Sequence, residues 1–272
     1  MDEAIRKMSA QLNLMLENWV LFGFFWGFVT LLALLELKRP ALPQKSGGDG
    51  RLVVNVIFGA LGMVIGPVIG LTSASVAQSH HFGLLNLINA PLWSGLLVSV
   101  LALSFADYWL HRVFHRVDWL WRLHKVHHSD DVIDISTAWR AHPLNNVLIG
   151  AAQAVPALLL GLPILAVLLY QLLHAFVVTW QHANIAHNPI FNRWAAYLLV
   201  TPEFHQVHHS AARAETDSNY SVLFSIWDWI LGTAKRLGPE EHQAIRIGLG
   251  SHYDQDAGNL RAQVMLPFRR AQ

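Results

Sequence analysis

Long apolar runs dominate the first two thirds of the chain. One run covers residues 19–37, and others extend from about Val53 to Ser73 and from about Leu92 to Leu110. Each is close to the ~20 residues that an α-helix needs to cross a bilayer. The pattern therefore predicts three membrane-spanning helices, and the third leads directly into a polar stretch that is rich in histidine.

A fourth and longer apolar stretch, residues 144–180, is interrupted by Pro156, Gly161 and Pro163. Proline ends or kinks a helix, and glycine permits the backbone conformations of tight turns. The stretch therefore predicts a helical hairpin that enters and leaves the membrane on one side. From residue 188 onward the chain is polar enough to predict a cap outside the membrane.

Basic residues between the apolar runs indicate the orientation. Four Lys and Arg residues lie in residues 38–51, whereas residues 74–91 contain none. Because cytoplasmic loops are enriched in Lys and Arg, we expect residues 38–51 and the histidine-rich segments on the cytoplasmic face. Residues 74–91 and the N-terminus are expected on the opposite, non-cytoplasmic face of the membrane. The predicted fold is an all-α integral membrane bundle of about three spans plus a helical hairpin, with a cytoplasmic histidine-rich helical cap.

Composition supports a multi-pass membrane protein. Hydrophobic residues make up 53% of the 272 residues, charged residues make up 14%, and the mean hydropathy is +0.34. The net charge of +1 and the lack of a basic tract give no indication of nucleic-acid binding. The absence of cysteine excludes disulfides, thiolate zinc sites and thiolate-held Fe–S clusters. We expect an N-terminal transmembrane region (1–91), a catalytic domain (92–236) and a C-terminal cytoplasmic tail (237–272).

Histidines recur at helical spacing in the polar segments. The candidate metal ligands are His111, His115, His124, His127, His128, His182, His187, His205, His208 and His209. Two sets of three share the spacing H-x-x-H-H: His124, His127 and His128, and then His205, His208 and His209. On a helix this spacing places three imidazoles on one face. A closed zinc site needs only about four ligands, so ten histidines are too many for one ion. The spacing predicts a two-metal site.

A lone histidine on an apolar helix is more often a core or membrane-interface residue than a ligand. A repeated H-x-x-H-H spacing has no such explanation. A carboxylate-bridged di-iron bundle needs Glu-x-x-His pairs, and a zinc-protease helix needs His-Glu-x-x-His. Neither motif occurs in the sequence. The residues therefore indicate a site made entirely or almost entirely of histidine, at the cytoplasmic face of the membrane.

Further residues are candidates to orient the ligands, because a metal-bound imidazole donates its other ring N–H to a carboxylate or a carbonyl. They are Asp107, His142, His174 and Asp228. His142 precedes a proline that suits a first helical turn, so it is equally a helix-start residue. His174 is expected near the face of His182, or in a hydrogen bond inside the hairpin. Asp228 is expected to hold the cap together.

Four ordered segments carry a resemblance to a known family. DYWLHRVFHRVDWLWRLHKVHHS, TAWRAHP, VTPEFHQVHHS and NYSVLFSIWDWILGT resemble the fatty acid hydroxylase and sterol desaturase superfamily, over roughly residues 95–236. The resemblance implies a membrane-bound, non-haem di-iron oxygenase that hydroxylates or desaturates a lipid such as a sterol, a fatty acyl chain or a carotenoid. It implies nine of the ten ligands, with His187 the doubtful tenth. Of the two reactions we predict hydroxylation.

The resemblance also implies partners. They are the lipid substrate, O2 and a separate electron donor, which is a ferredoxin or a cytochrome b type protein with a reductase. From the residues alone, an alternative is a histidine-rich membrane protein that binds or transports metal. A transporter would place its ligands near the membrane midplane on broken helices. The histidine groups here follow the ends of apolar runs and alternate with Arg and Lys, which favours the enzyme.

Overall fold

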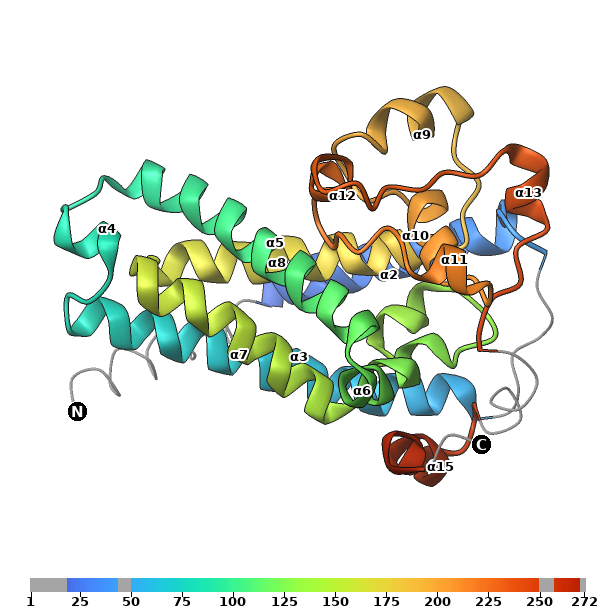
Figure 1. The fold of residues 1–272 in the computed structure, drawn as a ribbon, viewed down its shortest axis with the longest axis horizontal. Coiled ribbons are helices and arrows are strands. Elements are labelled where there is room, and N and C mark those ends of the chain that lie inside the picture. The colour runs from blue at the N-terminus through green and yellow to red at the C-terminus, as the bar shows by residue number, and fades with distance from the viewer. Residues whose placement is uncertain (1–18, 44–49, 250–256, 270–272) are drawn as a thin grey trace.

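The computed structural model describes residues 19–43, 50–249 and 257–269. Within these ranges the regular structure is helical, and strand pairing is limited to one isolated bridge between Ser210 and Ile247. Five long helices run side by side as an elongated bundle (Figure 1). They are α2 (Trp19–Lys38), α3 (Arg51–Ser79), α5 (Leu92–Arg116), α7 (Pro143–Leu160) and α8 (Ile164–His182).

All five helices are long and apolar enough to cross a membrane. Large apolar side chains point outward from them, for example Phe24, Trp93 and Leu159, which are 71%, 69% and 63% exposed. Such exposure is stable only where the surrounding solvent is itself apolar. The prediction of three spans plus a hairpin is confirmed. Residues 1–18 and 44–49, to which part of the orientation argument refers, lie outside the described residues.

Two spans are longer than the hydropathy pattern predicts. α3 continues to Ser79 and α5 continues to Arg116, so the first histidine pair is part of a spanning helix. Hydropathy falls where a helix leaves the lipid, but the backbone hydrogen bonds of the helix do not end there. The first two ligand candidates therefore lie on a rigid element that is anchored in the membrane.

The hairpin turn between α7 and α8 needs glycine. Gly161 has a φ of 68°, and a Cβ at this position would lie 2.5 Å from the carbonyl oxygen of Phe82. Only glycine adopts this conformation and also permits so close an approach. Pro163 then sets the N-terminus of α8. The short helix α4 (Leu84–Leu87) packs over this end of the bundle (Figure 1).

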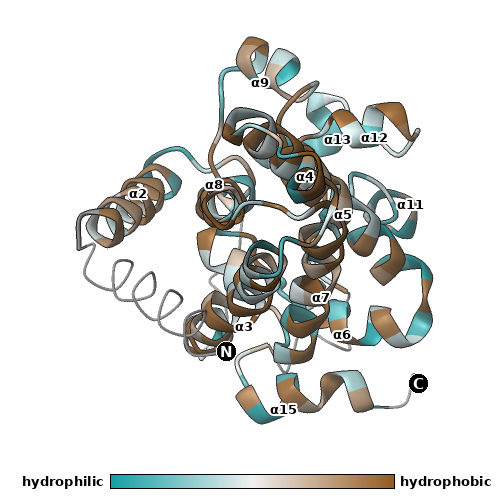
Figure 2. Ribbon diagram, turned by 90° about the vertical axis from the view of Figure 1, so that its left-hand side faces the viewer, coloured by the Kyte–Doolittle hydropathy of each residue, from teal (hydrophilic) through white to brown (hydrophobic). Residues whose placement is uncertain are grey.

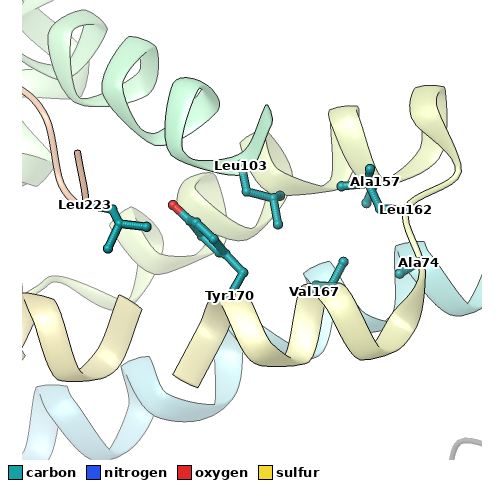
Figure 3. Close-up of a cluster of buried hydrophobic side chains, with 7 residues drawn as sticks. All are labelled: Ala74, Leu103, Ala157, Leu162, Val167, Tyr170 and Leu223. Carbon is teal, nitrogen blue, oxygen red and sulfur yellow. The ribbon is translucent and has the colours of Figure 1, made fainter. Parts of the chain in front are cut away.

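Four of the spanning helices meet in one apolar core cluster (Figure 3). The cluster comprises Ala74, Leu103, Ala157, Leu162, Val167, Tyr170 and Leu223. Alanine at two of these positions lets the helices approach closely, as small residues do in membrane bundles. Leu223 comes from the cap, so the same cluster also fixes the cap to the bundle.

The remaining described helices are short and gather at one end of the bundle, where the cap was predicted (Figure 1). They are α6 (Asp118–His128), η1 (Ile135–Trp139), α9 (Pro189–Ala195), α10 (Pro202–His208), α11 (Arg213–Thr216), α12 (Ile226–Ile230), α13 (Pro239–Gln243), α15 (Leu260–Met265) and η2 (Leu266–Phe268). Seen along the bundle, α9, α11, α12, α13 and α15 lie around the outside of the long helices (Figure 2). The helical cap exists, whereas its side of the membrane stays a prediction.

A buried ion pair connects the cap to the bundle. The Arg51 guanidinium, at the start of α3, donates to the Asp130 carboxylate at 2.7 Å, and it also contacts Asp134. Asp130 is fully buried and follows α6 directly. Removing one partner of such a pair leaves an uncompensated buried charge, which is strongly destabilising. The pair therefore fixes where α6 lies relative to the membrane helices.

Candidate metal centre

Nine of the ten predicted ligands converge in two adjacent groups at the junction of bundle and cap. The first group is His111, His115, His124, His128 and His208; the second group is His127, His182, His205 and His209. All nine side chains are buried, and within each group the candidate ligand atoms lie within 4.8 Å of one another. Neither group contains a carboxylate, so the donor set suits transition metals rather than Mg²⁺ or Ca²⁺.

The two H-x-x-H-H motifs are shared between the groups in opposite ways. α6 gives His124 and His128 to the first group and His127 to the second. In the other motif, His205 and His209 belong to the second group and His208 to the first. Residues four apart lie nearly above one another on a helix, and the residue between them is turned to one side. This rotation explains why each motif reaches both groups.

Hydrogen bonds fix the orientation of five imidazole rings through Nδ1. In a neutral ring whose Nδ1–H donates, Nε2 keeps its lone pair and can bind a metal. The acceptors are the carbonyl of Tyr220 for His111 (2.7 Å), the carbonyl of Ser218 for His208 (2.7 Å), the carbonyl of Val178 for His182 (2.7 Å), the carbonyl of Arg140 for His127 (3.2 Å) and the amide oxygen of Asn145 for His124 (3.3 Å).

The Nε2 atoms that remain face one another. His127 and His182 approach to 3.1 Å between their Nε2 atoms, and His111 and His124 approach to 3.0 Å. With Nδ1 protonated in each ring, these are contacts between two acceptors, which only a shared cation or proton relieves. Nε2 of His128 also has no hydrogen-bond partner among the described residues. The residues present therefore fit two metal ions held by neutral imidazole.

The surroundings keep the histidines of the cap uncharged. Burial lowers the pKa of His127 and of His209 well below the usual value for imidazole, and neighbouring histidines lower it further. Desolvation disfavours the charged imidazolium, so each ring retains the lone pair that a metal requires. The low-dielectric site thus prepares the ligands before any metal arrives.

His187 is the predicted ligand that the structure places outside both groups. Its Nε2 accepts a hydrogen bond from Trp180 Nε1 at 3.2 Å, and its Nδ1 donates to the carbonyl of Ile185 at 2.9 Å. α8 ends at His182, and the chain that follows is not helical, so the spacing between the two histidines does not place them on one face. Both ring nitrogens of His187 are engaged within the protein.

Three of the predicted orienting residues, Asp107, His174 and His142, have other partners. Asp107 accepts hydrogen bonds from Gln153 Nε2 (2.9 Å) and the Tyr170 hydroxyl (2.6 Å), and lies 3.7 Å from His174 Nε2. No ligand histidine bonds Asp107 or His174 among the described residues. These polar groups tie α5, α7 and α8 together inside the bundle. His142 accepts from the N–H of Leu144 at 3.2 Å, so it caps the start of α7.

Asp228 acts on a ligand indirectly. Its carboxylate is fully buried and accepts hydrogen bonds from the backbone N–H groups of Tyr220 (2.8 Å) and Ser221 (2.9 Å) and from the Thr233 hydroxyl (2.6 Å). Tyr220 in turn presents its carbonyl to His111. Asp228 therefore holds the loop that orients a ligand of the first group, besides its predicted role in the cap.

Sequence reasoning missed the residues that hold Nδ1. Asn145 is buried on α7 and accepts from His124, but nothing distinguishes it in the sequence from the other asparagines near the boxes. The carbonyls of Ser218 and Tyr220 have no sequence signal, because every residue carries a carbonyl group. The sequence indicated these residues only through the segment Asn219-Tyr220-Ser221, which lies between the last histidine motif and Asp228.

Two adjoining cavities of about 140 Å³ each lead from the histidine groups into the bundle. The inner cavity is lined by His111, His124 and His127, and the outer one reaches Phe25 on α2 and Met63 on α3. The two share six lining residues, which are Ala138, Ala141, Asn146, Ile149, His174 and Val178. A mostly apolar path, with Asn146 and His174 among its lining residues, thus runs from the membrane-spanning region to the candidate metal centre.

Comparison with known proteins decides the family. The model of the fatty acid hydroxylase family matches residues 96–233, half of the chain, and this range contains all nine grouped histidines. The chain belongs to the fatty acid hydroxylase family. The family assignment confirms the resemblance inferred from the four sequence segments.

The names of several similar proteins denote enzymes that act on lipids. The chain is 35% identical to human alkylglycerol monooxygenase over 136 residues, which cover 49% of the chain and 29% of that protein. It is 29% identical to the ornithine lipid hydroxylase OlsE of Rhizobium tropici, over 89% of the chain and 73% of that protein. It is also 29% identical to a very-long-chain aldehyde decarbonylase of Oryza sativa, over 57% of the chain and 26% of that protein. No solved structure matches the chain.

Proposed function

We propose that this protein is a membrane-bound, non-haem di-iron oxygenase that hydroxylates a lipid. The observation that carries the proposal is the pair of buried histidine groups whose bare Nε2 atoms face one another. Iron held by these nine histidines would activate O2 for attack on a C–H bond, which side-chain acid–base chemistry does not achieve. Membership of the fatty acid hydroxylase family supports iron as the metal.

The chain's own residues bind and position the substrate. An acyl or alkyl chain in the outer cavity lies against Phe25 and Met63, and continues into the inner cavity beside His111 and His124. The apolar walls exclude water from the reacting carbon. Because a displacement of about 1 Å can change a rate by ~10²-fold, the shape of these cavities selects the carbon that reacts.

The reaction needs an external source of electrons. In a hydroxylation one oxygen atom of O2 enters the lipid C–H bond, and two electrons and two protons reduce the other atom to water. We propose that a separate ferredoxin or cytochrome b type protein with its reductase supplies the electrons. The names of the relatives support a polar lipid as substrate, because two of them denote enzymes acting on an alkylglycerol and on an ornithine lipid.

We also propose that the centre lies on the cytoplasmic face. The histidine-rich segment between residues 111 and 128 also carries Arg112, Arg116, Arg122 and Lys125. Such an excess of basic residues beside membrane spans is typical of the cytoplasmic side. A metal transporter, the alternative function, would hold its ligands near the membrane midplane. Here the ligands sit at the last turns of α5 and α8 and in the cap, which favours the enzyme.

Turnover under 18O2 tests the proposal. The protein is purified in detergent, analysed for metal, and supplied with a ferredoxin, its reductase, NADPH and a lipid extract from cells that lack the protein. We expect bound iron, no Soret band and a product lipid that carries one 18O atom. An unlabelled alkene with all label in water would mean desaturation, and fully active protein without redox-active iron would refute the oxygenase.

A further inference from the structure

Helix α9 is amphipathic in the opposite sense to a helix on a water-soluble surface. Ile190, Phe191 and Trp194 point outward and are 70%, 50% and 66% exposed. Asn192 is buried instead, and its side-chain amide donates to the Glu203 carboxylate. A helix in water buries its apolar side, so this arrangement is stable where the medium outside is apolar. Apart from the exposed Arg193, the outward side chains named here are apolar while the buried Asn192 is polar, and this arrangement indicates contact with lipid.

The neighbouring segments continue the same surface. After α9, Tyr197 and Leu198 are 46% and 55% exposed. On α12, Ile226 and Ile230 are 38% and 65% exposed, while Asp228 between them is fully buried. We call these seven residues, Ile190, Phe191, Trp194, Tyr197, Leu198, Ile226 and Ile230, the α9–α12 surface. Apolar residues gathered on one flank in this way mark a membrane or protein contact rather than a water-exposed face.

This surface is continuous with the lipid-facing side of a spanning helix. Trp227 on α12 packs against Phe105 of α5, with 5.0 Å between ring centroids, and its Nε1 donates to the Ser104 hydroxyl at 3.1 Å. Phe105 and Trp109 of α5 are themselves 39% and 41% exposed. Figure 1 places α9 and α12 beside the end of the bundle, on the flank of α5 and α8, rather than beyond it. The membrane that surrounds α5 therefore reaches the α9–α12 surface.

Cations accompany the aromatic residues of the surface. The guanidinium of Arg193 lies 5.7 Å from the ring centroid of Trp194, and that of Arg236 lies 6.0 Å from the ring of Tyr197. Arg236 also donates to the backbone carbonyl of Arg193 at 3.3 Å, which ties its side chain to α9. Trp and Tyr beside Arg are typical of the headgroup level of a bilayer, where the ring is apolar and the cation meets phosphate.

We propose that the α9–α12 surface is inserted into the headgroup and acyl-chain boundary of the adjacent leaflet. The cap is then seated partly in the membrane and not only above it, which revises the expectation of an aqueous cap from residue 188 onward. α9 lies in the chain between His182 and His205, two ligands of the second group. Insertion of α9 therefore sets the depth of the candidate metal centre, so that a lipid reaches it without leaving the bilayer.

Single cysteines test the insertion, because the natural chain has none. Phe191→Cys, Trp194→Cys and Ile230→Cys are each spin-labelled and reconstituted in vesicles of phosphatidylcholine and phosphatidylglycerol. Leu101→Cys, on the lipid-facing side of α5, is the membrane reference, and Glu240→Cys, exposed on α13, is the aqueous reference. The readout is spin relaxation by O2, which concentrates in lipid, against relaxation by a water-soluble nickel chelate. The measurement requires neither metal loading nor activity.

We expect the three test labels to be relaxed by O2 as Leu101→Cys is, and to be protected from the nickel chelate. Nickel access equal to that at Glu240→Cys for Phe191→Cys and Ile230→Cys would overturn the proposal. Spin–spin broadening at Phe191→Cys that disappears on dilution with unlabelled protein would also overturn it, since a second copy would then cover the surface. The substituted side chains are all exposed and none belongs to a buried core cluster, and gel filtration of each variant verifies the fold.

Discussion

The backbone of Tyr220 connects the carboxylate of Asp228 to the imidazole of His111. Asp228 accepts the N–H of Tyr220 at 2.8 Å, and the carbonyl of the same residue accepts Nδ1–H of His111 at 2.7 Å. A carboxylate that contacts none of the nine candidate ligands thereby helps to orient Nε2 of one of them, His111. Partners of this kind at metal sites typically change metal affinity 10–100-fold when they are lost, by order of magnitude.

Asp228→Ala should weaken metal binding at the first group specifically. The change leaves two backbone N–H groups and the Thr233 hydroxyl without their acceptor, at a cost of about 1–3 kcal/mol per unsatisfied buried group. We expect iron affinity at the first group to fall roughly 10–100-fold. Iron titration of the purified protein measures the effect. Asp118→Ala, at an exposed position, is the matched control and should bind iron as the wild-type protein does. Unchanged iron affinity in Asp228→Ala would show that Asp228 stabilises the cap but does not orient His111.

Removing one candidate ligand from either group should disable the centre. His208→Ala takes a ligand from the first group and His127→Ala takes one from the second. Each is expected to abolish turnover and to reduce bound iron, while the protein remains folded in the membrane. Turnover assays and metal analysis on each variant provide the measurement. If His127→Ala keeps full iron and full activity, the assignment of the first H-x-x-H-H motif, His124 to His128, to the centre is wrong.

His187→Ala is the informative counterpart to the ligand variants. Its ring is engaged by Trp180 and by the carbonyl of Ile185, outside both groups. We therefore expect full iron content and turnover within about twofold of wild type. Substitutions away from the core and from functional sites generally change the free energy of unfolding by no more than about 0.5 kcal/mol. Loss of one iron in this variant would return His187 to the ligand set.

Arg51→Met should destabilise the junction of bundle and cap. The substitution removes the cation that is hydrogen-bonded to the buried Asp130 carboxylate, and breaking a buried pair costs about 3–5 kcal/mol. Thermal unfolding in detergent should show a clear decrease in midpoint. The double variant Arg51→Met with Asp130→Asn removes both charges and should recover part of the loss. A double variant as unstable as the single one would mean that the cost arises from the contact of Arg51 with Asp134.

Metal removal should lower the thermal stability of the wild-type protein. A ligand that binds only the folded state stabilises it in proportion to the logarithm of its concentration over its dissociation constant. A chelator should therefore shift the unfolding midpoint of wild type downward but leave that of a His127→Ala and His208→Ala double variant unchanged. Differential scanning fluorimetry compares the two. An equal shift in both would place the stabilising metal elsewhere.

The orientation in the membrane is open to a direct test. We expect cysteines introduced at Arg39 and Glu240 to react from the cytoplasmic side, and a cysteine at Gln78 to react from the opposite side. All three positions are exposed, so accessibility depends on the membrane alone. Labelling with an impermeant maleimide in intact cells and in inverted vesicles distinguishes the two sides. Labelling of Gln78→Cys from the cytoplasm would overturn the orientation.

The spans were predictable because lipid imposes a single requirement on the sequence, a sufficient length of apolar residues. The end of α5 was not predictable, since the turn that carries His111 and His115 is polar and continues the helix beyond the lipid. The surface character of α9 was hidden for a related reason. Its sequence alternates Asn and Arg with Ile, Phe and Trp, and only the packed structure reveals that the polar Asn192 is the buried side.

The histidines were predictable as a set, and their division into two groups was not. Helical spacing alone places His124, His127 and His128 on one face of α6. Which group each one joins depends on where α8 and α10 approach that face, and this is a tertiary relationship without a local signal. His187, the doubtful tenth ligand, lies outside both groups, in the non-helical chain that follows α8, and its role stays a prediction.

The opposite sharing of the two H-x-x-H-H motifs has a consequence for assembly. Each candidate metal position draws histidines from both α6 and the second motif, so neither group is complete until both segments are in place. The first ion to bind would draw together the same two segments that the second ion needs, and would remove their remaining freedom in advance. Loading should accordingly be cooperative, with few molecules holding a single ion at any point during reconstitution.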